Sequence, residues 1–136
     1  MKISLDLHGV ITDMPEALSK MTEVLIRGGA EVHIITGSPT DKAIEELSEI
    51  GFQKNIHYTH VIGVNNFLCK KGKEPLGDEL DRYGNPLFSE IDWDTAKAQY
   101  CRENEIDLHL DDSDIYDKYF TTPYARIYTK NNHGKN

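Results

Sequence analysis

Residues 2–13, KISLDLHGVITD, lead from a short apolar segment into a glycine turn that two aspartates bracket. The first part, KISLDLH, is short and suits extended backbone, which predicts a buried strand. Asp6 stands near the end of that strand, and the chain turns at Gly9. In α/β folds, ligands bind at the carboxyl ends of the strands. The meaning of this segment therefore depends on whether the rest of the chain predicts such a fold.

The rest of the chain alternates between strand and helix patterns. Strand patterns are EVHIIT (31–36), YTHVIGV (58–64), IDLHL (106–110) and YARIYT (124–129). Helical patterns cover 15–29, 38–51 and 93–105. This alternation predicts an α/β fold, a doubly wound three-layer sandwich with a mostly parallel, Rossmann-like five-stranded sheet. A single domain over 1–136 is expected, with an extended loop or small insert at about 64–92.

Composition narrows the classes of function. The 136-residue chain carries a net charge of −8, which argues against nonspecific binding to nucleic acid or to an anionic membrane as its main role. No apolar run approaches the roughly 18 residues of a membrane span. Cys69 and Cys101 lie far apart without a CxxC spacing. They predict free thiols in a reducing compartment, so the expected location is the cytoplasm.

Three polar clusters follow predicted strands and should meet at one edge of the sheet. Asp6 and His8 follow the first strand, residues 36–38 (TGS) follow the second, and Asp111 and Asp112 follow the fourth. Carboxylates that converge repel one another unless a cation neutralises them, and oxygen-rich clusters suit Mg²⁺. The sequence therefore predicts a magnesium site at this edge.

An anion site is expected beside the acidic residues. Thr36 offers a hydroxyl, and Gly37 offers a backbone N–H near a predicted helix start, where anions bind. If the helix before the fourth strand begins near Asp94, Lys97 lies in its first turn, close to the same edge. A cation site, an anion site and a nearby aspartate together indicate phosphoryl transfer, with the aspartate as nucleophile.

Four segments resemble the sequence motifs of the haloacid dehalogenase-like (HAD) superfamily of Mg²⁺-dependent aspartyl phosphatases. They are DLHGVITD (6–13), VHIITGS (32–38), a lysine matched by Lys97, and IDLHLDDSD (106–114), in the family's order. The resemblance implies a HAD-like fold and phosphoester hydrolysis with Mg²⁺ as cofactor.

The resemblance also implies a role for each matched residue. Asp6 would be the nucleophile, forming an aspartyl-phosphate, and would also bind Mg²⁺. The backbone carbonyl of His8 would be a metal ligand, and Asp111 and Asp112 would complete the metal site. The phosphoryl group would be held by Thr36, Gly37 and Lys97.

His8 departs from the family pattern, in which an aspartate acts as general acid. Histidine is chemically able to transfer this proton, so His8 is either the working acid and base or the sign of a weakened enzyme. The alternative is therefore a HAD-like binding module. A phosphoacceptor receiver domain is a weaker alternative, because its acidic pair follows the first strand. A dinucleotide-binding domain is disfavoured because the first turn lacks GxGxxG.

A cap domain covers many related sites, but residues 14–30 have room for one helix only and residues 65–94 are too few for a full cap. An open site suits a phosphorylated small molecule, a nucleotide or a nucleic-acid end, and a homo-oligomer could cover it. No membrane partner is expected.

Other polar residues have structural interpretations. Asp13 is expected to cap the first helix, and His33 and His109 are expected to pack in or near the core. The histidines of HYTH (57–60) are expected at the surface, and the tail 130–136 is expected to fray.

Overall fold

The computed structural model describes residues 1–130, so most of the predicted tail lies outside the described residues. Five parallel strands form one sheet in the order β3-β2-β1-β4-β5. The strands are β1 (Lys2–Leu5), β2 (Glu31–Thr36), β3 (His60–Gly63), β4 (Leu108–Asp111) and β5 (Tyr124–Arg126). The predicted α/β fold is confirmed, and all of its strand pairs are parallel.

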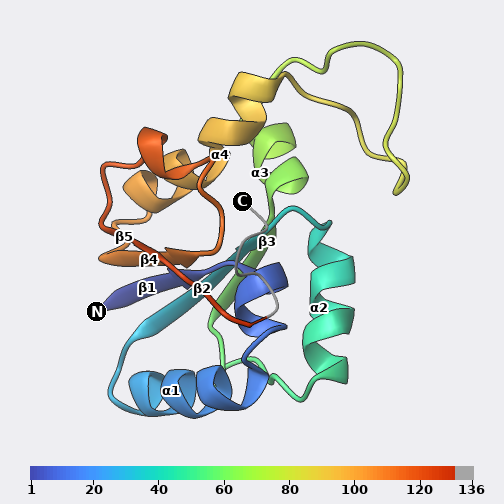
Figure 1. The fold of residues 1–136 in the computed structure, drawn as a ribbon. Helices are drawn as coiled ribbons and strands as arrows, with labels where there is room; N and C mark the ends of the chain where they lie inside the picture. Colours follow the sequence, from blue (N-terminus) through green and yellow to red (C-terminus); the bar gives the residue numbers. More distant parts are fainter. Residues whose placement is uncertain (131–136) are drawn as a thin grey trace.

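Helices cover both faces of this sheet. They are α1 (Pro15–Arg27), α2 (Thr40–Glu49), α3 (Val64–Lys70) and α4 (Glu90–Glu103). Figure 1 shows the sheet nearly edge-on, with α1 on one side and α3 and α4 on the other. The core on the α1 side includes Leu5, Ile34 and Leu47. The core on the α4 side includes Ile35 and Cys101.

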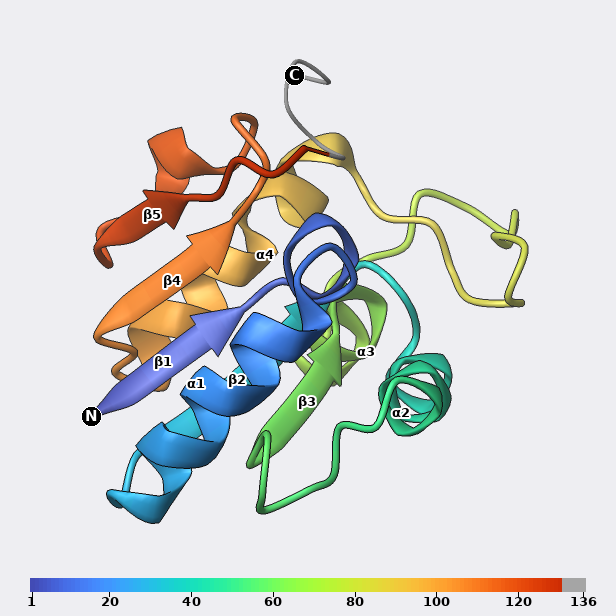
Figure 2. The same cartoon turned by 60° about the horizontal axis from the view of Figure 1, so that its bottom comes forward.

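The order of the strands places a topological switch point at β1. From β1 the chain crosses to β2 and β3 on one side, and later returns to β4 and β5 on the other. Figure 2 shows β1 between these two halves, with its carboxyl end pointing into the turn that follows. Parallel α/β sheets bind ligands at such a point, because the connections diverge there and leave a crevice. Asp6 is the first residue after β1.

The start of α1 differs from the prediction. Pro15 occupies the first turn, where its missing N–H is harmless. The predicted cap Asp13 is wrong, because the residue at the cap position is Met14, which makes no side-chain capping bond. Instead, Asp13 Oδ2 accepts a hydrogen bond of 2.6 Å from the Thr129 hydroxyl. Asp13 therefore ties the segment after β5 to the segment before α1.

The start of α4 also differs. The helix begins at Glu90, one turn before the expected start near Asp94, because the Ser89 hydroxyl accepts a hydrogen bond of 3.1 Å from the Asp92 N–H. Lys97 therefore lies beyond the first turn of α4.

The segment expected to be a loop or insert at about 64–92 begins with a helix, α3. Residues 71–89 form an extended excursion from the body of the molecule, drawn in yellow-green in Figure 1. A single antiparallel bridge joins Leu80 to Pro86 within this excursion. No helix among residues 1–130 combines the length and the apolar composition needed to cross a membrane.

Candidate functional site

Three carboxylates meet at the switch point. Asp6, Asp111 and Asp112 each offer an oxygen, and these oxygens lie within 4.8 Å of one another. The register of the sheet explains the meeting, because Leu5 pairs with Leu110 and the Asp6 N–H donates a 3.0 Å hydrogen bond to the Leu110 carbonyl. The residues that follow these two strands therefore lie side by side.

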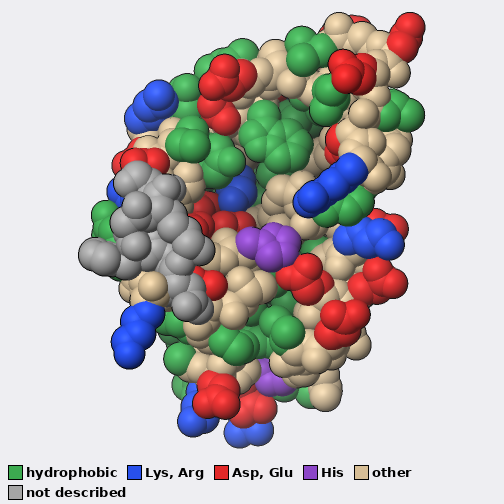
Figure 3. Space-filling model, turned by 45° about the vertical axis from the view of Figure 1, so that its right-hand side comes forward, with side chains coloured by type: hydrophobic (Ala, Val, Ile, Leu, Met, Phe, Trp, Pro, Cys, Tyr) green, Lys and Arg blue, Asp and Glu red, His purple; other side chains and the backbone are tan. Residues whose placement is uncertain are grey.

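Lys97 reaches this acidic cluster from α4. Its Nζ lies 3.2 Å from Asp6 Oδ1 and donates a 2.9 Å hydrogen bond to Asp111 Oδ2. The lysine is almost fully buried, and its Nζ also lies 5.1 Å from the centre of the Tyr116 ring. Figure 3 shows a recess with acidic and basic atoms at its base and a histidine at its border. One ammonium group thus bridges two of the three carboxylates.

The pKa values of these groups follow from their burial and charges. Burial, opposed by Lys97 and assisted by Asp111, raises the pKa of Asp6 to about 8. Burial also opposes ionisation of Asp111, but Lys97 and His109 hold the pKa of that carboxyl well below its usual range. Burial disfavours the Lys97 cation, yet Asp6 and Asp111 raise its pKa further above its usual value. The cluster therefore holds its lysine charged and resists ionisation of Asp6 until another cation arrives.

We expect Asp6 to leave a signature in the pH dependence of folding. Because folding raises its pKa, the stability that protonated Asp6 contributes is fully present below its ordinary pKa of 3.8 and is lost as the pH rises through about 8. In buffer with a chelator, Asp6→Asn should therefore gain stability relative to the wild type over this range. Urea unfolding at a series of pH values measures the difference, and a constant difference would contradict the assignment.

The turn after β1 brings the backbone close to this cluster. Residues 7–11 form a single wide turn, η1 (Leu7–Ile11), closed by a 3.0 Å hydrogen bond from the Thr12 N–H to the Leu7 carbonyl. Gly9 has φ +86°, which favours glycine, and a Cβ there would collide with the Asp112 carboxylate. Gly9 therefore serves the turn and also leaves space for Asp112.

His8 makes a contact that the sequence did not indicate. Its side chain is half-exposed, and its Nε2 lies 2.6 Å from Glu46 Oε2 on α2. Glu46 is one of several acidic residues on that helix, and nothing in the sequence marks it apart from its neighbours. A carboxylate on one ring nitrogen orients the imidazole and fixes which nitrogen carries a proton. His8 and Glu46 therefore form an oriented pair between η1 and α2.

Thr36 and Gly37 lie at the carboxyl end of β2, the neighbour of β1. Thr36 is fully buried, and its Oγ1 accepts a 3.3 Å hydrogen bond from the Ser38 N–H. A Cβ on Gly37 would contact the Trp93 ring at 3.5 Å. The helix that follows begins at Thr40, whose N–H donates to Asn66 Oδ1 at 3.0 Å. This first N–H of α2 is therefore already engaged within the chain.

A buried chain of hydrogen bonds connects Asp111 to His109, Ser4 and Cys101. Its Oδ2 accepts from His109 Nε2 at 2.9 Å, and His109 Nδ1 lies 2.6 Å from the Ser4 hydroxyl. The Ser4 hydroxyl lies 3.3 Å from Cys101 Sγ. Burial lowers the pKa of His109 and raises that of the Cys101 thiol to about 11, so both groups are neutral. The Cys101 thiol then donates to the Ser4 hydroxyl, the Ser4 hydroxyl donates to His109 Nδ1, and His109 Nε2 donates to Asp111.

His33 and His109 are both buried in the sheet, as predicted. The buried hydrogen-bond chain was missed as a functional feature, because a histidine in a strand of apolar residues carries no signal beyond its burial. Trp93 and Tyr116, which lie near Gly37 and Lys97, were also missed.

The chemistry of the acidic cluster fits a hard divalent cation. All of its candidate side-chain ligands are carboxylate oxygens, the donors that Mg²⁺ prefers, and burial makes the charge of Asp6 costly without one. No protein-family model matches the chain, and no curated protein matches it either. Its function must therefore be inferred from this site.

Proposed function

We propose that the protein is a Mg²⁺-dependent phosphatase of the HAD type, which hydrolyses phosphoesters through an aspartyl-phosphate on Asp6. The observation that carries the proposal is the meeting of Asp6, Asp111 and Asp112 with Lys97 at the switch point of a parallel sheet. Such a reaction needs carboxylates that bind a cation, an ammonium group that binds the phosphoryl group, and an aspartate that acts as nucleophile.

The residues that would hold Mg²⁺ are Asp6, Asp112, Asp111 and the backbone carbonyl of His8. Asp111 already accepts hydrogen bonds from Lys97, His109 and the Ser113 N–H. We therefore give Asp111 a second role, positioning Lys97, beside its place in the metal site with Asp6 and Asp112. When bound, Mg²⁺ would neutralise charge on the phosphoryl oxygens and among the carboxylates.

The reaction has two balanced steps. A carboxylate oxygen of Asp6 forms a bond to phosphorus, the bond from phosphorus to the leaving oxygen breaks, and His8 donates a proton to that oxygen. A water oxygen then forms a bond to phosphorus and the water gives a proton to His8, while the bond from phosphorus to the Asp6 oxygen breaks. Inorganic phosphate leaves and the Asp6 carboxylate is restored. Lys97 and Thr36 would hold the phosphoryl group throughout, together with the Gly37 backbone.

Hydrolysis of an aryl phosphate, with and without a chelator, tests the proposal. The expected result is phosphate release that requires Mg²⁺. Turnover that chelation leaves unchanged would contradict the metal's role. If Mg²⁺ binds but no phosphoester is hydrolysed, the chain is instead a HAD-like binding module that has kept the fold and the cation site.

Replacing His8 with alanine tests its role as the general acid. We expect a loss of about 10²–10⁴-fold on an alkyl phosphate, the usual range for this role. The loss should be much smaller on an activated aryl phosphate, because its leaving group needs little protonation. Steady-state rates on both substrates measure the effect.

Glu46→Gln is the companion variant, because it removes the charge but not the shape of the residue that orients His8. It should lower the rate on the alkyl phosphate less than His8→Ala does. If His8→Ala slows both substrates equally, the histidine is not the acid. If His8→Asp raises the rate strongly, the native enzyme is a weakened one.

The proposed substrates are a phosphorylated small molecule, a nucleotide or a nucleic-acid end, and a panel of these compounds distinguishes them. The proposed setting is the cytoplasm, since Cys69 and Cys101 are both free thiols. A homo-oligomer would cover the open site, and size-exclusion chromatography with light scattering tests for it.

A further inference from the structure

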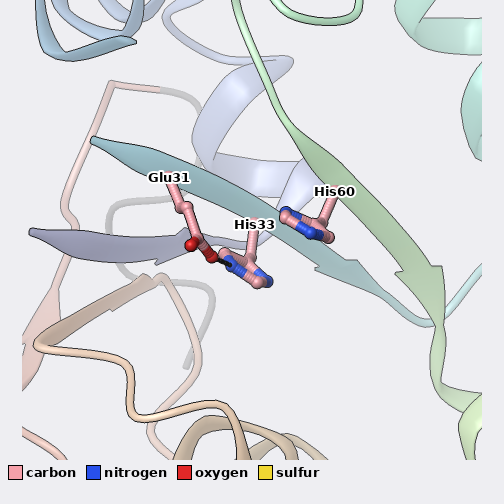
Figure 4. Close-up of side chains that lie close together, drawn as sticks. All are labelled: Glu31, His33 and His60. Carbon is pink, nitrogen blue, oxygen red and sulfur yellow. Dashed lines mark hydrogen bonds and ion pairs between the residues drawn. The ribbon is translucent and has the colours of Figure 1, made fainter. Parts of the chain in front are cut away.

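A second group of potential metal ligands lies on the same sheet, away from the acidic cluster. Glu31 and His33 come from β2 and His60 comes from β3, and their ligand atoms lie within 4.8 Å of one another. Figure 4 shows these three side chains on neighbouring strands. His33 pairs directly with His60 in the register of the sheet, and on its other side with Ser4. The group therefore lies at the level of the strand starts, while Asp6 follows the strand ends.

His33 is the fixed member of this group. Its side chain is only 3% exposed, and both ring nitrogens have partners. Nδ1 lies 2.6 Å from the Tyr100 hydroxyl, and Nε2 lies 2.8 Å from Glu31 Oε1. An ionised carboxylate only accepts, so Nε2 carries the proton and Nδ1 accepts from Tyr100. A proton therefore lies between His33 Nε2 and Glu31 Oε1, and a metal ion can take its place.

His60 presents a nitrogen lone pair. The Thr59 hydroxyl donates its only hydrogen to the Val32 carbonyl at 2.9 Å. It must therefore accept from His60 Nδ1, which lies 2.9 Å away and carries the proton of the neutral ring. Nε2 of that tautomer has no hydrogen and is free to ligate a metal.

We propose that Glu31, His33 and His60 form a binding site for a divalent transition-metal ion such as Zn²⁺. Two imidazoles and one carboxylate are a ligand set that suits zinc, and three protein ligands leave a fourth position open. The set does not suit Mg²⁺, which prefers oxygen donors. The two sites of the molecule therefore select different cations.

Binding requires two small rearrangements. The rings of His33 and His60 are stacked, with centroids 4.1 Å apart and planes 6° apart, so they cannot both aim a lone pair at one ion. His60 is exposed and its ring can turn. The Nε2 proton of His33 leaves, and Nδ1 takes up a proton, so this ring changes tautomer. The Tyr100 hydroxyl then accepts from Nδ1, because a hydroxyl can both donate and accept.

The fourth coordination position of the proposed zinc site has space for a further ligand. His60 and Tyr100 both line a cleft of about 860 Å³ beside the edge strand β3. A water molecule or a ligand from this cleft can complete the coordination of the ion. The proposal uses no residue of the acidic cluster and stands independently of the proposed function.

Calorimetric titration of the full chain with Zn²⁺, in excess Mg²⁺ to fill the acidic cluster, tests the proposal. We expect one equivalent to bind. His60→Ala and Glu31→Gln change exposed or half-exposed side chains, so both should fold, and each should weaken binding by at least about 10-fold. His57→Ala is the matched control, since that histidine lies three residues from His60 outside the group. It should leave the affinity unchanged.

Two further measurements locate the ion. Replacing Zn²⁺ with Co²⁺ should give visible absorption bands that His60→Ala abolishes. Binding should also persist in Asp6→Asn, which disables the proposed phosphatase and leaves this group intact. Zinc affinity that His60→Ala leaves unchanged would overturn the proposal. So would a thiolate charge-transfer band, which would assign the ion to Cys69.

Discussion

Asp6→Asn is expected to reduce phosphoester turnover by on the order of 10⁴-fold or more, because it removes the attacking group itself. An amide oxygen does not form the acyl-phosphate that the proposed reaction needs. The fold should survive, since an asparagine oxygen can still accept the 2.9 Å hydrogen bond from the Leu7 N–H. Lys97 also keeps its bond to Asp111. Steady-state kinetics and circular dichroism of the purified variant measure the two effects.

The control for this variant is Asp114→Asn. Asp114 is an exposed aspartate three residues from Asp111, so its loss removes one negative charge near the site without touching the cluster. Its rate should stay within a few-fold of the wild type. A beryllofluoride complex, which mimics a phosphoryl group, should carry the fluoride adduct on Asp6. An adduct on another residue, or an active Asp6→Asn enzyme, would refute the assignment of the nucleophile.

The strand and helix patterns of the sequence predicted much of the fold because hydropathy reports burial directly. All five strand patterns correspond to strands, and the three helical patterns correspond to α1, α2 and α4. The helix α3 was missed because it has only seven residues, Val64–Lys70, which are too few to show a helical period. Asp13 was assigned as a cap because aspartate favours that position, but its partner Thr129 lies far along the chain.

The sequence could predict those residues of the candidate site that directly follow a strand. Asp6, Asp111 and Asp112 follow strands that any parallel arrangement brings to one edge, and the structure brings them together. Lys97 was expected near this edge for the wrong reason, since it does not lie in the first turn of α4. It reaches the cluster because it lies on the face of that helix that packs on the sheet.

Side-chain pairs across long stretches of sequence could not be predicted. His8 and Glu46 meet because η1 and α2 lie close together, and neither residue type nor spacing shows this. His33 and His109 were both expected in the core, and both are buried there. Burial, however, does not reveal a partner. One of these histidines supports Asp111, and the other lies between Tyr100 and Glu31.

Lys97→Met is expected to destabilise the protein by about 3–5 kcal/mol near neutral pH, the usual cost of removing one partner of a buried ion pair. Methionine fills the space of the lysine stem but leaves the ionised Asp111 buried without its cation, beside an Asp6 whose pKa of about 8 keeps it mostly protonated. Turnover should also fall, by about 10²–10³-fold, because a charged group is lost from the proposed phosphoryl site. Lys118→Met, which changes an exposed lysine, is the control and should unfold like the wild type.

The pH dependence of the stability of Lys97→Met shows whether the variant is destabilised by the lost positive charge or only by poorer packing. Without the ammonium group, the pKa values of Asp6 and Asp111 should rise in the folded protein, so acid should favour the folded variant. The stability gap to the wild type should therefore narrow as the pH falls from neutral and Asp111 becomes protonated. Adding Asp111→Asn to Lys97→Met should recover part of the loss at neutral pH, because it removes the buried charge that Lys97 balanced. A gap that does not change with pH, together with a double variant no more stable than Lys97→Met, would show that Lys97 acts only through packing.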